Sequence, residues 1–329
     1  MSTMRDLKER GLLERFGPML RRHTEGLPLG TGDDVAITPD GYVWTIDTMV
    51  EGTHFLWYDD PLCTGAAIAA KLVASNVSDL CSKGAMPRFA LLSFGVPPTA
   101  PVERIASFYE GLDAELRRHG LVLLGGDTVG APQWTLTLTV VGELPLARLP
   151  IAARHAAAPG MAIYATGWPG ESGAGFELLQ GPDVALEAGT RAHLVRRHLS
   201  PEVHPSLGRR LVESLGPLAM IDLSDGLAKD SGEIANASGV AVILEKLPIS
   251  PMLRSAADAL RRAPEHFVLF GGEDYELLFC TAAGDDAVRR ACEGHVVHRV
   301  GAIEVGSGVW LRRCEGLVPV EKGAFDHFR

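Results

Sequence analysis

The stretch Leu121-Val-Leu-Leu-Gly-Gly-Asp-Thr128 carries the pattern that decides the predicted fold. Four apolar residues, Leu121–Leu124, predict a short strand, which ends in two glycines and a carboxylate. Side chains at a strand end lie at one edge of a sheet, where ligands bind in α/β proteins. A glycine beside the carboxylate lets backbone and ligand approach closely. The stretch therefore predicts a functional acidic residue, Asp127, at a sheet edge.

Acidic residues beside Gly, Ser or Thr follow apolar segments at five further places. The stretches are Gly32-Asp33-Asp34, Thr45-Ile46-Asp47-Thr48, Asn76-Val77-Ser78-Asp79, Asp222-Leu223-Ser224-Asp225-Gly226 and Gly271-Gly272-Glu273-Asp274. Each of them taken alone is more often a turn or a helix cap than a ligand site. Carboxylates that gather repel one another unless cations hold them, and oxygen ligands with few His and no Cys nearby suit Mg²⁺ or Mn²⁺. Together, the six stretches predict a metal site that also binds phosphates, as phosphoryl transfer requires.

Strand-like and helix-like patterns alternate along the whole chain. Strands are expected at Tyr42–Asp47, Phe89–Val96, Trp134–Val141, Met161–Thr166, Ala219–Leu223 and Val240–Leu244, and two more, Phe267–Phe270 and Tyr275–Cys280, are expected to flank Gly271-Gly272. Helices are expected at Ala66–Leu80, Val102–His119, Ser172–Gln180, Ser206–Leu215 and Leu227–Ser238. This alternation favours an α/β or α+β architecture, with mixed sheets and packed helices, in both halves of the chain.

The chain length indicates two domains, because 329 residues exceed what one hydrophobic core usually supports. The segment Leu146–Gly160 is rich in Ala, Pro and Arg and lacks periodicity, so we place the domains at residues 1–148 and 149–329. The net charge of -10 disfavours nucleic acid as a partner, whereas ATP bound through metal cations remains compatible with it.

Several classes of protein are disfavoured by what the sequence lacks. The N-terminus has no apolar signal segment, and no apolar stretch approaches about 18 residues, so we expect a cytoplasmic protein without a membrane span. The five cysteines form no C-x-x-C pair, which indicates free thiols. P-loop and protein-kinase motifs are absent. The loop Gly167–Gly173 precedes a predicted helix and is either an anion site or an ordinary glycine-rich loop.

The ordered set of motifs resembles the thiamine-monophosphate kinase family over nearly the whole chain. The matching segments are GDD (32–34), DTMVEGTHF (47–55), NVSDLCSKGAMP (76–87), GGDT (125–128), IDLSDG (221–226), GGEDYELLF (271–279) and KGAFDHF (322–328). GGDT and LSDG are shared more loosely with aminoimidazole ribonucleotide synthetase, selenide water dikinase and a hydrogenase maturation protein. The resemblance implies a two-domain fold like that of the synthetase and a homodimer paired through the N-terminal domains. It also implies direct transfer of the terminal phosphoryl group of ATP to thiamine monophosphate, with several Mg²⁺ ions and no phosphoenzyme.

The resemblance also implies roles for individual residues. The implied metal ligands are Asp34, Thr45, Ile46 (through its backbone), Asp47, Asp79, Asp127, Asp222 and Asp225. The implied ATP contacts are Gly126, Arg154, Ser224 and Tyr109, and the implied substrate contacts are His54, Glu273 and Phe325. No covalent nucleophile is required, because the acceptor phosphate is already an anion and the barrier lies in bringing two anions together.

Two alternatives remain open from the sequence. The chain could be another ATP-dependent synthetase or dikinase of the superfamily that acts on a different small molecule. It could also be a non-catalytic regulator that binds a metal or a nucleotide. Single side chains have plainer explanations too, since a loop histidine such as His54 is commonly a surface residue and Arg154 could be a solvated charge.

Overall fold

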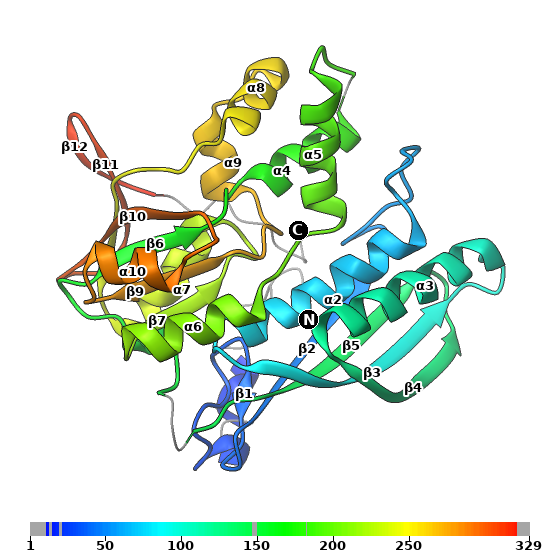
Figure 1. Cartoon of the computed structure of the whole chain (residues 1–329), viewed down its shortest axis with the longest axis horizontal. Coiled ribbons are helices and arrows are strands. Elements are labelled where there is room, and N and C mark those ends of the chain that lie inside the picture. The colour runs from blue at the N-terminus through cyan, green and yellow to red at the C-terminus, as the bar shows by residue number, and fades with distance from the viewer. Residues whose placement is uncertain (1–10, 13–14, 20–21, 147–149, 182, 321–329) are drawn as a thin grey trace.

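The computed structural model describes residues 11–12, 15–19, 22–146, 150–181 and 183–320. Its strands form two mixed sheets with helices packed on them, which confirms the predicted α/β class (Figure 1). Within the described residues, no helix is long and apolar enough to cross a membrane. All five cysteines are free thiols, as predicted.

The first sheet has five strands in the order β1-β2-β5-β3-β4. Their bounds are β1 (Ala36–Ile37), β2 (Tyr42–Val50), β3 (Met86–Val96), β4 (Val122–Gly130) and β5 (Thr135–Glu143). Only β3 and β4 are parallel to each other. Two helices, α2 (Gly65–Cys81) and α3 (Val102–His119), pack together on one face of this sheet (Figure 1). The alternation of β2 and β5 puts Val43 and Leu138 beneath the helices, whereas Trp44 and Ile46 are exposed on the other face.

The second sheet has seven strands in the order β12-β11-β8-β10-β6-β9-β7. They are β6 (Ala162–Thr166), β7 (Ala219–Asp222), β8 (Ala241–Leu244), β9 (Leu277–Thr281), β10 (Val297–Glu304), β11 (Gly308–Arg313) and β12 (Gly316–Pro319). The accompanying helices are α4 (Glu171–Gln180), α5 (Ala188–Leu199), α6 (Pro205–Leu215), α7 (Leu227–Ser238), α8 (Pro251–Leu260), α9 (Pro264–Phe270) and α10 (Asp285–Ala291). Short 3-10 turns occur at Arg22–Thr24 and Arg154–Ala156.

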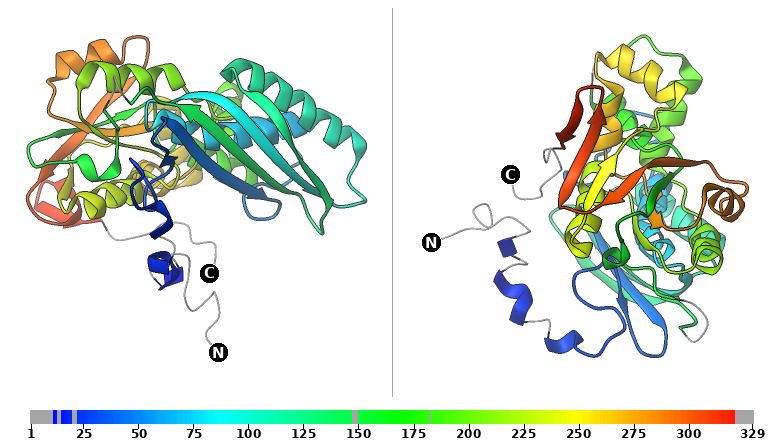
Figure 2. Two further views of the ribbon diagram at one scale, coloured as in Figure 1. Left: turned by 90° about the horizontal axis from the view of Figure 1, so that it is seen from below. Right: turned by 90° about the vertical axis from the view of Figure 1, so that its left-hand side faces the viewer.

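Helix α2 lies between the two halves of the molecule (Figures 1 and 2). The Thr64 hydroxyl caps its start by accepting a hydrogen bond from the Ala67 amide. Alanine and larger apolar residues fill most of its sequence, and it is buried nearly all round, as expected for a helix covered on every side. One buried cluster therefore joins Leu72 and Val77 of α2 to Val212 and Phe279 of the second half.

The predicted strand Phe267–Phe270 is wrong, because these residues form the end of helix α9. Pro264 in the first turn favours a helix, and Phe267, Val268 and Leu269 are buried. A four-residue apolar run does not by itself distinguish a buried strand from a buried helix. The neighbouring predicted strand Tyr275–Cys280 exists as β9, although it begins only at Leu277.

The late start of β9 follows from the backbone before it. Glu273 and Tyr275 have positive φ angles of 63° and 52°, which no strand accommodates. The division into domains at residues 148 and 149 falls between the two sheets and stays a prediction.

Candidate active site

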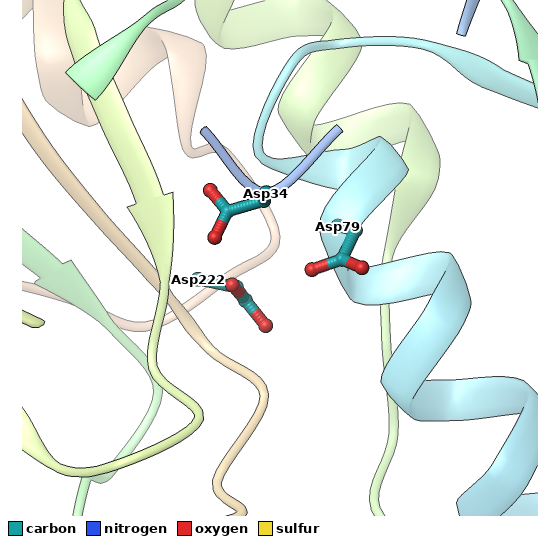
Figure 3. A group of neighbouring side chains, drawn as sticks. All are labelled: Asp34, Asp79 and Asp222. Atoms are coloured by element: carbon teal, nitrogen blue, oxygen red, sulfur yellow. The ribbon is translucent and has the colours of Figure 1, made fainter. Parts of the chain in front are cut away.

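Three aspartates from distant parts of the sequence meet between the two halves of the molecule. Asp34 follows the glycine of the GDD stretch, Asp79 lies in the last turns of α2, and Asp222 ends β7. Figure 3 shows the three side chains grouped together, and each offers an oxygen within 4.8 Å of the others. The structure thus brings together three of the predicted metal ligands.

Hydroxyl groups orient two of these carboxylates. The Ser78 hydroxyl donates to Asp222 Oδ2 at 2.8 Å, and the Thr45 hydroxyl donates to Asp79 Oδ2. Asp47 lies beside them on β2, and its backbone N–H donates to Asn76 Oδ1 at 3.2 Å. Thr45 and Asp47 therefore lie next to three of the other predicted metal ligands.

Burial and mutual repulsion shift the pKa values of the cluster upward. The pKa of Asp222 is raised from its ordinary 3.8 to about 7, by burial first and then by the charge of Asp34. The pKa of Asp79 is raised well above its ordinary value by burial and by Asp222, Asp47 and Asp34. Burial, with a contribution from Asp34, also raises the pKa of Asp47. Such carboxylates favour a bound cation, because a cation removes the repulsion that raises these pKa values.

Two basic side chains reach the same site from the other side of Asp34. The fully buried Lys83 Nζ lies 2.6 Å from Asp33 Oδ1 and 3.0 Å from Asp34 Oδ2. The Arg154 guanidinium also pairs with Asp34, and its backbone N–H donates to Asp33 Oδ2 at 3.1 Å. Burial raises the pKa of Asp34, but Lys83 and Arg154 outweigh it, so this pKa lies below its ordinary value. Asp34 therefore keeps its charge, and Arg154 is directed at the carboxylates.

The loop after β7 carries Ser224 and Asp225 on the same side of the molecule. The Glu273 N–H donates to the Ser224 carbonyl at 2.8 Å, so the loop and the GGED segment are joined through their backbones. Asp225 Oδ2 lies 2.7 Å from Lys229 Nζ and does not belong to the three-aspartate cluster.

The predicted substrate contacts His54 and Glu273 both approach α2. The Glu273 carboxylate binds Lys71 Nζ at 2.7 Å, and Lys71 also donates to the His54 carbonyl at 3.4 Å. The Val50 N–H donates to His54 Nδ1 at 3.0 Å, so the neutral ring carries its proton on Nε2. The third predicted contact, Phe325, lies outside the described residues.

The glycine-rich loop before α4 binds a carboxylate of the same chain. The buried Asp274 carboxylate accepts hydrogen bonds from the Gly170 and Ser172 backbone amides at 2.7 and 3.0 Å. These amides belong to the start of α4, where a negative charge is stabilised. Of the two possibilities left open by the sequence, the structure supports a structural loop, whose anion is a carboxylate of the same chain.

Gly126 and Asp127 lie far from the three aspartates in this chain. Gly126 on β4 shares a row of the sheet with Leu92, Leu138 and Asp47, and three strand spacings of about 4.8 Å separate it from Asp47 by roughly 14 Å. Asp127 follows in the next row and faces away from α2. The predicted strand end before Gly125 is wrong, because β4 continues to Gly130 and contains Asp127.

Tyr109 of α3 lies on the same side of the molecule as β4. Its ring is 5.3 Å from that of Phe94, which pairs with Thr128. The predicted residues thus form two groups, one with the three aspartates and one around β4.

Sequence reasoning missed several polar residues of the site, of which Lys71, Lys83 and His198 are the main ones. The sequence did contain a signal for the two lysines, because each is a cation within or just after helix α2, most of whose residues are buried. Their partners come from other parts of the chain, which no local pattern reveals.

Comparison with known proteins agrees with this geometry. Residues 32–144 match the family described as AIR synthase related protein, N-terminal domain. The fold and the acidic site thus define a protein of the AIR synthase-like class.

Sequence relatives identify the family within this class. The chain is 36% identical to thiamine-monophosphate kinase of Escherichia coli (strain K12), over 97% of this chain and 98% of the relative. It is 31% identical to the enzyme of the same name from Bacillus subtilis (strain 168), over 93% and 95% of the two chains. The solved structure described as AaThiL complexed with AMPPCP and TMP matches with a TM-score of 0.86 at 27% identity and covers 99% of both chains. The chain belongs to the thiamine-monophosphate kinase family.

Proposed function

We propose that this protein transfers the terminal phosphoryl group of ATP to thiamine monophosphate and forms thiamine diphosphate. The observation that carries the proposal is the convergence of Asp34, Asp79 and Asp222 in a chain of this family. The AMPPCP and TMP in the related structure support a nucleotide and a phosphorylated acceptor as its two ligands. We expect this activity in the cytoplasm.

The three-aspartate cluster fits Mg²⁺. Its donors are carboxylate oxygens from three segments, and hydroxyl groups rather than cations bind Asp79 and Asp222 directly. Oxygen donors of this kind suit a hard divalent ion that also takes phosphate ligands. When bound, magnesium would neutralise charge on the phosphates during transfer. Asp47 and the Thr45–Ile46 segment adjoin the cluster and are proposed to complete its ligands, together with Asp225.

The remaining side chains of the site are proposed to bind and orient the two anions. Arg154 presents a planar guanidinium toward the cluster and suits the oxygens of the nucleotide phosphates. Ser224 lies on the loop that Glu273 joins, and we propose that it contacts the nucleotide. Glu273 provides a negative charge for the cationic thiazolium, and His54, which meets the same Lys71 ammonium, is proposed to contact the organic part of the acceptor. Transfer is proposed to be direct, because an anionic acceptor requires no general base.

A homodimer is proposed because it would unite the two groups of predicted residues. Asp127 faces away from α2, on the same face of the sheet as Ile46, which adjoins Asp47. Face-to-face packing of two such sheets about a two-fold axis would place Asp127 of one chain beside residues 45–47 of the other. Gly126, next to Asp127, would then approach the nucleotide from the second copy, whereas Tyr109 lies on the helix-covered face and its nucleotide contact stays a prediction.

The exposed face has the composition of an interface. Trp44, Ile46, Leu91 and Leu124 have exposed fractions of 44%, 63%, 44% and 62%. Trp44, Leu91 and Leu124 line an apolar hollow of about 250 Å³. An apolar patch of this kind on a folded protein marks a contact with another surface.

A turnover assay with thiamine monophosphate, ATP and Mg²⁺ tests the reaction, with the product identified by mass. We expect thiamine diphosphate and ADP in equal amounts, and none with Asp79→Asn. Formylglycinamidine ribonucleotide and selenide serve as competing acceptors for the alternative enzymes of the superfamily. Binding of ATP without ADP formation with any acceptor would instead indicate a regulator.

Mixing two inactive variants tests the shared site. Asp127→Asn and Asp47→Asn should each abolish turnover while leaving the fold intact. After co-refolding, half of the dimers are mixed and each holds one complete site, so about one quarter of wild-type activity should return. No recovery in a verified mixed dimer would place both residues in the same chain's site and refute the arrangement.

A further inference from the structure

Lys71 is a charged residue near the middle of the buried helix α2, with an exposed fraction of 2%. Its ammonium has three N–H donors and three acceptors around it. They are Glu273 Oε1 at 2.7 Å, the His54 carbonyl at 3.4 Å and His198 Nε2 at 3.5 Å. Each acceptor comes from a different segment, so this one side chain joins the loop after β2, helix α5 and the GGED segment to α2.

The contacts also define the state of His198. Its Nε2 accepts from Lys71, so the neutral ring carries its proton on Nδ1. That nitrogen lies 3.2 Å from Ser172 Oγ and 3.4 Å from Glu273 Oε2. Each oxygen of the Glu273 carboxylate therefore has a partner within the protein, Lys71 for Oε1 and His198 for Oε2, although the side chain remains 29% exposed.

Helix α2 presents its polar residues as a stripe. Lys71, Ser75, Ser78 and Asp79 are spaced as neighbours on one side of a helix. Ser78 binds Asp222 at one end, and Lys71 binds Glu273 at the other. Eight residues separate Lys71 from Asp79, which is about 12 Å along the helix axis. A phosphorylated acceptor with a cationic organic part could span this distance, with its phosphate toward Asp79.

We infer that Lys71 is a positioning residue, which holds the Glu273 carboxylate and the His54 carbonyl at a fixed distance from the three aspartates. The inference rests on the proposed function, because it assigns Glu273 and His54 to the organic part of the acceptor. Packing alone does not explain Lys71, since a buried ion pair is often no more stabilising than an apolar residue of similar size. The strained positive φ of Glu273 is consistent with a side chain that must be held in one place.

The test compares Lys71→Met with the wild type and with the exposed control Lys246→Met. We expect KM for thiamine monophosphate to rise about tenfold or more, because a charge-assisted contact is lost. We expect kcat and KM for ATP to change by less than about threefold, since the aspartates lie about 12 Å away. Calorimetric titration with thiamine monophosphate alone should show the same weakening without any turnover. Lys246→Met should match the wild type.

A double-mutant cycle with Glu273→Gln tests whether Lys71 acts through Glu273. Both substitutions remove the same interaction between Lys71 and Glu273. The double variant should therefore bind thiamine monophosphate no more weakly than whichever single variant binds it less tightly. Additive losses, or an unchanged KM in Lys71→Met, would overturn the inference while leaving the proposed function intact. If Lys71→Met does not fold, Lys71→Gln must give the same KM increase. A wild-type protein that neither binds nor phosphorylates thiamine monophosphate would refute the proposed function and this inference with it.

Discussion

Asp222→Asn should stabilise the metal-free protein at high pH. Asp222 is buried against Asp34 and Asp79, and these groups are held together against their mutual repulsion. Asparagine keeps the shape of the side chain and can still accept the hydrogen bond from Ser78. The substitution therefore removes a buried charge without creating a cavity or losing a hydrogen bond.

The magnitude follows from the pKa shift of Asp222 and, for its electrostatic part, from Coulomb's law. The pKa of Asp222 rises from 3.8 to about 7 on folding, a difference of about three units that corresponds to about 4 kcal/mol. Two unit charges at 4.8 Å, the upper limit of the separations between these oxygens, repel by about 3.5 kcal/mol at an effective dielectric constant of about 20. Because the folded pKa lies above the unfolded one, the penalty is absent below about pH 3.8 and complete above about pH 7.

Chemical unfolding in EDTA at pH 5 and pH 8 measures this effect. We expect a gain of about 3 kcal/mol in the free energy of unfolding at pH 8 and of about 1 kcal/mol at pH 5. For 329 residues this gain corresponds to about 4 °C in Tm. The exposed Asp59→Asn is the matched control and should change neither value.

Magnesium should reduce or reverse the difference, because the ion stabilises the wild type more than the variant. A variant that is less stable than the wild type in EDTA at pH 8 would refute the reasoning. A gain of equal size at both pH values would also refute it, since the penalty would then not arise from the Asp222 charge.

Three further predictions concern the metal site and the exposed sheet. Lys83→Met should lower the free energy of unfolding in EDTA by about 3–5 kcal/mol, because Asp33 and Asp34 lose their buried partner, and thermal scans with and without Mg²⁺ should show partial recovery with the ion. Trp44→Glu, on the exposed face of β2, should shift the protein toward monomers in analytical ultracentrifugation and lower its turnover; a fully active monomer would contradict the shared site. Calorimetric titration should show about tenfold weaker Mg²⁺ binding at pH 6 than at pH 8, because Asp222 with a pKa of about 7 must lose its proton to bind the ion, and a pH-independent affinity would remove Asp222 from the metal ligands.

Local sequence patterns predicted those helices and strands whose ends are determined by residues next to them in the sequence. The helix Val102–His119 was predicted with its observed bounds, because Gly120 adopts the left-handed conformation that ends it. The convergence of Asp34, Asp79 and Asp222 was also predicted, since strand and helix ends meet at the edges of sheets.

Features that depend on tertiary contacts could not be predicted from local sequence patterns. The partners of Lys71 and Lys83 lie in segments remote from α2. The separation of Asp127 from the cluster depends on the strand order, in which β3 lies between β5 and β4 although these two follow each other in the sequence. No periodicity in the sequence encodes that order.

The central position of α2 limits which substitutions this protein can tolerate. Residues 71–79 contact both sheets and also supply the polar stripe, so most substitutions there would impair folding and chemistry together. A saturation library should therefore tolerate almost nothing in this helix, and its losses would not separate a folding defect from a chemical one. Substitutions that change which acceptor the enzyme uses should arise instead in α5 and in the loop at residues 271–276. Side chains from these segments reach the Lys71 end of the polar stripe, and they do not form the core of the first sheet.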